Sequence, residues 1–367
     1  MFRTEVLEVN MGPQHPATHG VLRIVLGLDG ETVLDAKPMI GYLHRGVEKL
    51  SEHKLYTMVP PLADRLDYVG SASQNVGYIQ AVEKLCGIEV PERGQYIRVI
   101  MLELNRISSH LVWLGTHALD IGAMTVFFYC FRERETILDL FESFCGARLT
   151  TNMFRIGGSL EDLPPGWIER CRRFIDVELP SGLGEYEGLL SANRIWLERT
   201  KGVGVISAED AIDLGVTGPC LRGSGVAYDV RKAMPYAAYD RFQFDIPSFP
   251  GCDTYDRYLV RLEEMRQSAR IIRQALDTLP GGDFRAPKVP KKIKPPAGEI
   301  YHVVEGPRGE QGFYVKSDGT ERPSRVHFRS PSFVNLQALP IMSKGHLVAD
   351  VVAIIGTLDI VLGDSDR

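Results

Sequence analysis

Apolar residues recur at alternating steps of three and four positions in two long stretches of the chain. This spacing places them on one face of an α-helix. The first stretch contains Ile100, Leu104, Ile107, Leu111, Leu114, Ala118 and Ile121, and the second contains Leu262, Met265, Ala269, Ile272, Leu276 and Leu279. Pro280-Gly281-Gly282 ends the second stretch, and a shorter helix is predicted over 132–144. Two long helices with one apolar face each predict an antiparallel helical bundle.

The two ends of the chain predict β-structure. Residues 21–36 hold two apolar runs around Asp29-Gly30, a pair that favours the tight turn of a hairpin. Short strands are predicted over 300–304, 312–316 and 325–328. The sequence therefore predicts an α+β fold in four parts. They are an N-terminal β-hairpin subdomain with its loop (1–37), the helical bundle (38–282), a Pro- and Lys-rich loop (283–298) and a C-terminal β-containing segment (299–367).

Composition mainly excludes classes of protein. The net charge is −5, and nucleic-acid-binding proteins usually carry a basic surface, so we expect no nucleic-acid partner. The apolar stretch 111–131 has His117 and Asp120 near its middle, and a central aspartate opposes membrane insertion; we expect a buried core helix. The six cysteines form no C-x-x-C pair, which favours buried thiols. Without a signal sequence, the chain is expected to be cytosolic or peripheral to a membrane.

Histidines are concentrated near the N-terminus, at His15, His19, His44 and His53. Two prolines and two glycines predict a loop over 12–20, and no carboxylate or thiol completes a metal-binding set nearby, so we expect no metal. A loop histidine, the phenol of Tyr68 and the carboxyl of Asp120 could instead supply protons to a carbonyl group under reduction. Taken alone, His19 and Tyr68 are better explained as packing residues. The partner of Asp120 stays open between a histidine and an arginine.

Five motifs carry a resemblance to one family. In sequence order they are 12–23 (GPQHPATHGVLR), 40–49 (IGYLHRGVEK), 64–68 (DRLDY), 127–135 (FFYCFRERE) and 331–337 (PSFVNLQ). With these motifs the chain resembles the quinone-site subunit of complex I-type NADH:quinone oxidoreductases, the D-type subunit of bacteria and the 49-kDa subunit of mitochondria. The resemblance extends from about residue 5 to Arg367, with a variable segment at 283–298.

This resemblance implies roles for the matching residues. His19 and Tyr68 would each hold one carbonyl group of the quinone head, and Thr116 would be a further quinone contact. Asp120 would pair with His19, which keeps the imidazole oriented as a proton source. His19, Tyr68 and Asp120 would then be the catalytic residues, because hydrogen-bond donors stabilise the negative charge that develops on the quinone oxygens.

A second group of residues would lie near the terminal four-iron four-sulfur cluster, which the neighbouring subunit binds. The resemblance places Arg45 and Arg65 there, where fixed positive charge favours the reduced cluster. Thr150 is a departure from the family, since many relatives carry a histidine at this position. A threonine does not titrate, so we expect a cluster potential that depends weakly on pH and suits a low-potential quinone such as menaquinone or plastoquinone.

More distantly, the chain resembles the large subunit of nickel–iron hydrogenases. That family binds its metal through two C-x-x-C motifs, which would fall at 65–68 and near 363–367. This chain has no cysteine at either place, so a soft metal centre would lack its thiolate ligands. The cavity left by the metal would accept the quinone head.

The implied partners are a B-like iron–sulfur subunit, C-like and I-like subunits of the peripheral arm, and an H-like membrane subunit. Membrane contact would pass through these partners, at the cytoplasmic face of the cell membrane. Quinone would be the substrate, the chain would have no cofactor of its own, and reduction would be coupled to proton translocation. The electron donor (NADH, ferredoxin or a deazaflavin) and the quinone type stay open. The alternative is a scaffold that only docks partners, which would tolerate conservative changes at His19 and Tyr68.

Overall fold

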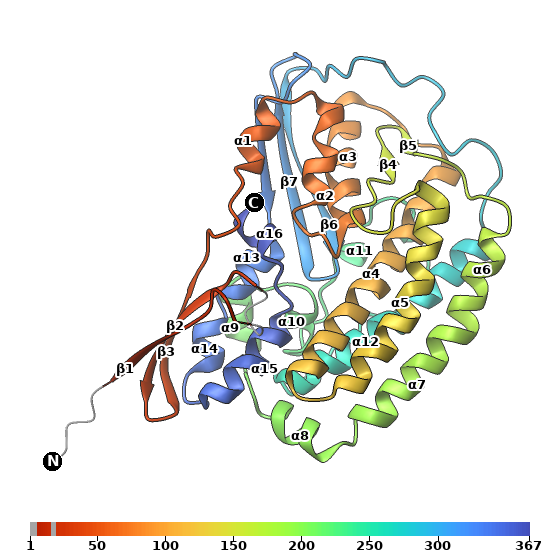
Figure 1. Ribbon diagram of the computed structural model, residues 1–367. Helices are drawn as coiled ribbons and strands as arrows, with labels where there is room; N and C mark the ends of the chain where they lie inside the picture. Colours follow the sequence, from red (N-terminus) through yellow and green to blue (C-terminus); the bar gives the residue numbers. More distant parts are fainter. Residues whose placement is uncertain (1–5, 16–19) are drawn as a thin grey trace.

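The computed structural model describes residues 6–15 and 20–367 and has separate helical and β regions, which confirms the α+β class (Figure 1). An antiparallel sheet lies at each end of the chain, and most of the helices lie between them in the sequence. The elements not described individually below are α6 (Trp167–Arg173), α8 (Arg194–Thr200), α9 (Ala208–Asp213), α11 (Val230–Ala233), the short strands β4 (Phe154–Arg155) and β5 (Gly158–Ser159), the 3₁₀ turns Tyr56–Met58 and Tyr239–Arg241, and the π-helical turn Phe174–Glu178.

The N-terminal sheet has the strand order β1-β2-β3. The predicted hairpin is β2 (Arg23–Asp29) and β3 (Thr32–Met39), and Gly30 supplies the positive φ of 61° in its turn. The third strand, β1 (Leu7–Met11), was not predicted, although apolar and polar residues alternate along it; the Gly- and Pro-containing segment 12–20 separates it from the hairpin in the sequence. Along β2 every second residue is buried, which turns one face of the sheet toward a small hydrophobic core.

The bundle is built around α4 (Glu92–Asp120), with α5 (Met124–Cys145) and α12 (Thr254–Asp277) packed beside it and α7 (Leu179–Leu190) beyond (Figure 1). The apolar stripes predicted on α4 and α12 are buried over nearly their whole length. The expectation of one buried helix over 111–131 is wrong. The chain turns at 121–123, and Leu119, Met124 and Phe128 are exposed there. Within the described part of the chain, no helix combines the length and apolar character needed to span a bilayer.

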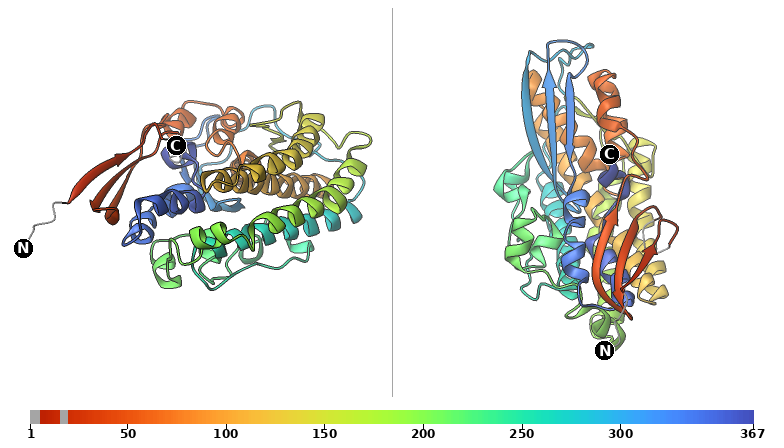
Figure 2. Two further views of the ribbon diagram at one scale, coloured as in Figure 1. Left: turned by 60° about the horizontal axis from the view of Figure 1, so that its bottom comes forward. Right: turned by 90° about the vertical axis from the view of Figure 1, so that its left-hand side faces the viewer.

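The C-terminal sheet contains β6 (Gly298–Gly306), β7 (Gly309–Ser317) and β8 (Arg325–Arg329) and packs on α3 (Ser71–Cys86). Gly77 of α3 leaves the space that the Phe313 ring fills. The chain then forms α13 (Pro331–Leu336), α14 (Leu339–Ser343), α15 (Val348–Leu358) and α16 (Leu362–Asp366), which lie between the N-terminal sheet and the bundle (Figure 2). They share the smaller core with that sheet, so the last residues of the chain lie near the first motifs.

Candidate functional site

Tyr68 lies on a turn between α2 (Pro60–Asp64) and α3, and its side chain is 38% exposed. Its neighbours Leu66 and Asp67 are fully buried, so the turn is anchored from inside and presents the phenol at the surface. The Oδ1 atom of Asp67 accepts a hydrogen bond from the Gly70 amide at 2.9 Å, which closes the turn. A Cβ at Gly70 would collide with the Asp67 carboxylate, so only glycine fits this close approach.

Arg308 holds the Tyr68 turn through contacts with the buried Asp67. It lies between β6 and β7 and is buried, with 3% exposure. Its Nη1 atom donates to both carboxylate oxygens of Asp67, at 3.0 and 2.9 Å, and to Ser109 Oγ of α4 at 3.1 Å. Its Nε and Nη2 atoms donate to the carbonyl and carboxylate oxygens of Asp359, at 2.8 and 3.2 Å. One guanidinium therefore connects three segments that are distant in sequence.

The C-terminal helix closes the same site. A Cβ added to Gly363 would lie 2.6 Å from the Leu66 carbonyl oxygen, so α16 contacts the backbone of the turn directly. Asp364 is buried and accepts hydrogen bonds from Gln74 at 2.8 Å and Ser330 at 2.5 Å. The two places where the hydrogenase family would have its C-x-x-C motifs, 65–68 and 363–367, thus lie side by side. Among the described residues, no group of three or more histidines, cysteines or carboxylates is arranged to hold a metal ion.

Burial and charge both shift the titration of this site. Burial raises the pKa of the Tyr68 phenol, and the positive charge of Arg308 opposes that rise. Burial also raises the pKa values of Asp359 and Asp364, while Arg308 lowers that of Asp359. The Tyr68 phenol is therefore a proton donor that stays neutral at pH 7, beside one permanent cation.

Asp120 is the last residue of α4 and is exposed, so the expectation that it lies buried in an apolar helix is wrong. The protein packed against one side of the carboxyl is enough to raise its pKa to about 6, and the charge of His15 acts in the opposite direction. The histidine that acts on Asp120 among the described residues is thus His15. His19, which we expected in this role, lies outside the described residues.

Thr116 is one turn before Asp120 and half-buried. Its hydroxyl donates to the carbonyl oxygens of Val112 and Trp113, at 2.9 and 3.1 Å, within its own helix. Within the described ranges, no hydrogen bond joins Tyr68 to Thr116 or Asp120. Thr116 and Asp120 lie on α4, whereas Tyr68 lies between α2 and α3, so the candidate site is drawn from different elements.

The residues predicted near a partner's cluster fall into two neighbouring groups. Arg45 donates from Nη2 to the Arg65 carbonyl at 2.8 Å, and both side chains are exposed. Arg45 precedes α1 (Val47–Glu52) and Arg65 follows α2, so the two motifs meet at the surface. His44 has a supporting contact, with its Nδ1 atom 2.6 Å from the Asp366 carbonyl oxygen.

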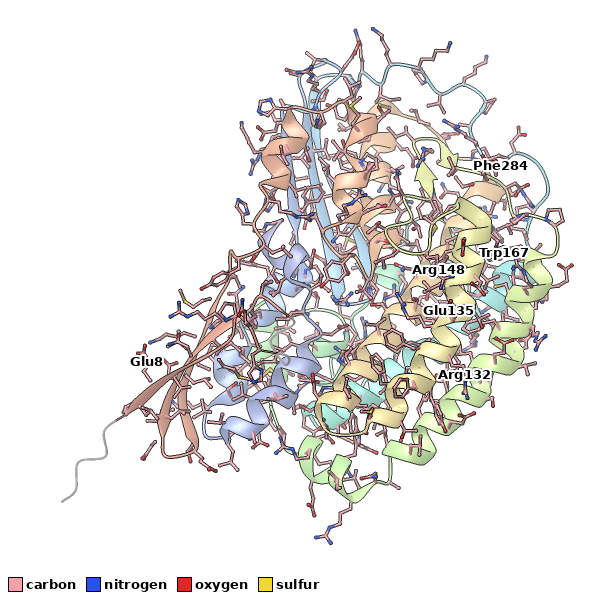
Figure 3. All side chains as sticks on the ribbon, viewed as in Figure 1. Glu8, Arg132, Glu135, Arg148, Trp167 and Phe284 are labelled. Atoms are coloured by element: carbon pink, nitrogen blue, oxygen red, sulfur yellow. The ribbon has the colours of Figure 1, made fainter. Side chains whose placement is uncertain are left out.

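Thr150 lies on the segment after α5, in the left-handed conformation with φ 48°. Arg148 fixes this segment by ion pairs to the α5 residues Glu135, Asp139 and Glu142, and Figure 3 shows Arg148 beside Glu135. Beneath the segment, burial raises the pKa of Asp64 to about 7, and a contact with the Asn152 backbone lowers it only in part. A titratable group is therefore present here, although Thr150 itself does not titrate.

Comparison with known proteins decides the family. The family model described as respiratory-chain NADH dehydrogenase, 49 Kd subunit, matches residues 120–292 and 286–367. The D-type subunit of the NADH-quinone oxidoreductase of Geotalea uraniireducens is 55% identical over 391 aligned residues, covering 100% of both chains. The corresponding proteins of Trichlorobacter lovleyi and Desulforamulus reducens are each 56% identical, covering 100% of this chain and 100% and 99% of the relatives. The chain belongs to this 49-kDa subunit family.

Family membership confirms the resemblance given by the five motifs, and it makes the chain one subunit of an oxidoreductase complex. The sequence missed three residues around Tyr68, namely Arg308, Asp359 and Asp364. Their carboxylate and guanidinium groups come from segments about 240 to 300 positions away from the turn, as the Arg308–Asp67 bond over 241 positions shows. Only the sequence Gly306-Pro307-Arg308-Gly309, with a charge between two strands, gave a local sign of a special turn.

Proposed function

We propose that this chain forms the quinone-reduction site of a proton-pumping, complex I-type NADH:quinone oxidoreductase. The observation that carries the proposal is the Tyr68 turn, where an exposed phenol rests on a buried arginine–aspartate ion pair. A rigid scaffold beneath an accessible proton donor is what reduction of a bound carbonyl requires. Membership of the 49-kDa subunit family supports the same conclusion.

In this proposal the quinone head lies against Tyr68, with His19 at its second carbonyl group and Thr116 as a further contact. Electrons reach the quinone from an iron–sulfur cluster held by a neighbouring B-like subunit, beside Arg45, Arg65 and Thr150. Tyr68 and the pair of His19 with Asp120 donate the two protons that the reduced quinone takes up. Donors already in place stabilise the negative charge as it develops on the oxygens.

The surroundings of Asp120 support contact with partner subunits. Leu119, Met124 and Phe128 are exposed around the α4–α5 turn, and grouped exposed apolar side chains are typical of a covered surface. We assign this covering to the peripheral-arm and membrane subunits of the complex, the C-like, I-like and H-like subunits. The chain would then be a peripheral protein at the cytoplasmic face of the cell membrane. Changes in the charge of Asp120, whose pKa is raised to about 6, would pass to these partners and couple reduction to proton translocation.

The test is quinone reduction by assembled complex carrying Tyr68→Phe, which removes one hydroxyl group and little volume. We expect the rate to fall by about 10²-fold or more, because general acid catalysis contributes about 10²–10⁴-fold. Reduction of an artificial acceptor upstream and the iron–sulfur content should stay normal. The matched control is Tyr301→Phe, at an exposed position on strand β6, which should leave all three measurements unchanged. A scaffold that only docks partners predicts an unchanged rate for both variants.

A further inference from the structure

The guanidinium of Arg308 does two things to Tyr68 at once. Through its two hydrogen bonds to Asp67 it fixes the residue that immediately precedes the phenol. Through space, its charge is the largest influence that opposes the burial-raised pKa of Tyr68. Neither effect needs contact between Arg308 and the quinone, so Arg308 can act through Tyr68 and its turn.

The contacts of Arg308 leave it little freedom to move. Donors on Nε, Nη1 and Nη2 are all engaged, with Asp67, Ser109 and Asp359. Asp359 is itself held in the left-handed conformation, with φ 51°, at the end of α15. A guanidinium forked between two carboxylates in this way has a fixed orientation, which a lysine ammonium would not reproduce.

The charges around Arg308 show why its cation matters. Asp67, Asp359 and Asp364 all act on it as anions, and the charges of Arg261 of α12 and His110 of α4 also act on Asp359. The carboxylates of Asp67 and Asp359 disfavour loss of a proton from Tyr68, whereas Arg308 favours it. Without the arginine, a phenolate at Tyr68 would form beside buried negative charge.

We propose that Arg308 is a positioning residue for quinone reduction, because it holds the Asp67–Tyr68 turn and stabilises the phenolate left when Tyr68 gives its proton to the quinone. The inference rests on the proposed function. The quinone receives two electrons that originate from NADH through the complex. The O–H bond of Tyr68 breaks, an O–H bond forms on the quinone oxygen, and the phenolate later regains a proton from solvent.

The decisive variant is Arg308→Gln in the assembled complex, compared with Arg308→Lys, which keeps the charge. We expect Arg308→Gln to lower kcat for quinone reduction about tenfold and to change KM less than about threefold.

The solvent deuterium isotope effect on kcat should rise, because proton donation becomes slower. Arg308→Lys should recover only part of kcat, because it restores the positive charge but not the forked hydrogen bonds that hold the turn. In a Tyr68→Phe background, Arg308→Gln should cause no further loss, since both changes act on the same proton.

A purely structural role predicts other results. Partial misassembly also lowers kcat, through fewer active sites, but it leaves the isotope effect unchanged and adds to the loss in Tyr68→Phe. An unchanged isotope effect, an additional loss in Tyr68→Phe or a normal kcat therefore overturns the proposal. If Arg308→Gln does not assemble, the triple variant Asp67→Asn, Arg308→Gln and Asp359→Asn carries the test, because three amides can bond to one another without a buried charge. An unaffected Tyr68→Phe refutes the proposed function, whereas a collapsed Tyr68→Phe with normal Arg308→Gln refutes this inference alone.

Discussion

At the scale of single residues, Asp64 shows what burial does to a carboxylic acid. It is fully buried at the end of α2, and neither carboxylate oxygen has a well-formed hydrogen bond among the described residues. Burial raises its pKa to about 7, well above the usual value near 4. The folded protein therefore binds a proton that the unfolded chain releases between those two values. The stability that this proton confers is complete below pH 4 and is lost as pH rises through 7.

Asp64→Asn should remove this pH dependence. The variant keeps the shape of the protonated acid, so we expect equal stability near pH 4 and a more stable variant at pH 8. Between about pH 4 and 7 the wild type loses about 1.4 kcal/mol of stability per pH unit. Thermal inactivation rates of the assembled complex from pH 4 to 8.5 would measure this loss. Asp213→Asn, at an exposed position on α9, is the control and should follow the wild type throughout. Parallel profiles for Asp64→Asn and wild type would contradict the assignment.

At the scale of elements, the close contact between α16 and the Tyr68 turn depends on Gly363. A methyl group there would lie 2.6 Å from the Leu66 carbonyl oxygen, which belongs to the backbone and cannot rotate away. We expect Gly363→Ala to separate α16 from the turn and to destabilise the complex by about 1–3 kcal/mol, as overpacking usually does. Quinone reduction should fall with it, since Tyr68 is displaced.

The matched control is Gly188→Ala on α7, where the added methyl group meets open space. Alanine favours a helix over glycine by about 1 kcal/mol, so this variant should be neutral or more stable. Half-lives of quinone-reductase activity at raised temperature, with iron–sulfur content as the check of assembly, compare the two variants. Equal half-lives would show that α16 and the turn are not tightly coupled.

Some elements of the fold can be predicted from the sequence, and others cannot. The helices around 100–121 and 262–279 follow from hydrophobic period, because each buries one regular face. The C-terminal strands follow from their short runs of β-branched and aromatic residues. The turn at 121–123 does not, since the sequence stays apolar on both sides of it and the exposed Leu119, Met124 and Phe128 look like core residues. Tyr68 could be selected from a motif, but Arg308 could not, because its role exists only when β6, α4 and α15 are folded together. Tertiary contacts decide such positions, and no local pattern encodes them.

At the scale of the whole molecule, a buried network of charges joins the bundle to the C-terminal sheet. Arg222 of α10 (Pro219–Arg222) binds Glu264 of α12 at 2.6 Å and Glu305 of β6 at 2.9 Å. His110 of α4 reaches the same Glu264, with Nε2 2.8 Å from Oε2. Burial raises the pKa of Glu305 to about 7, and the Asp229 carboxylate adds to this effect. Arg222 thus forms ion pairs with several acids, and Glu305 is the acid of this network that most readily binds a proton.

The raised pKa of Glu305 predicts unequal losses of stability when either member of the Arg222–Glu305 ion pair is replaced. Glu305→Gln keeps an oxygen that can accept from Arg222 and resembles the protonated acid, so we expect a cost below about 1 kcal/mol near pH 7. Arg222→Met leaves Glu264 buried without its main cation, and breaking a buried pair in this way costs about 3–5 kcal/mol. The two variants would be compared by the yield of assembled complex and by its thermal inactivation rate at pH 7. Equal losses of stability in the two variants would mean that Glu305 is ionised and that Arg222 and Glu305 behave as a simple ion pair. A mild effect of Arg222→Met would mean that the bundle and the sheet are joined by their apolar contacts alone.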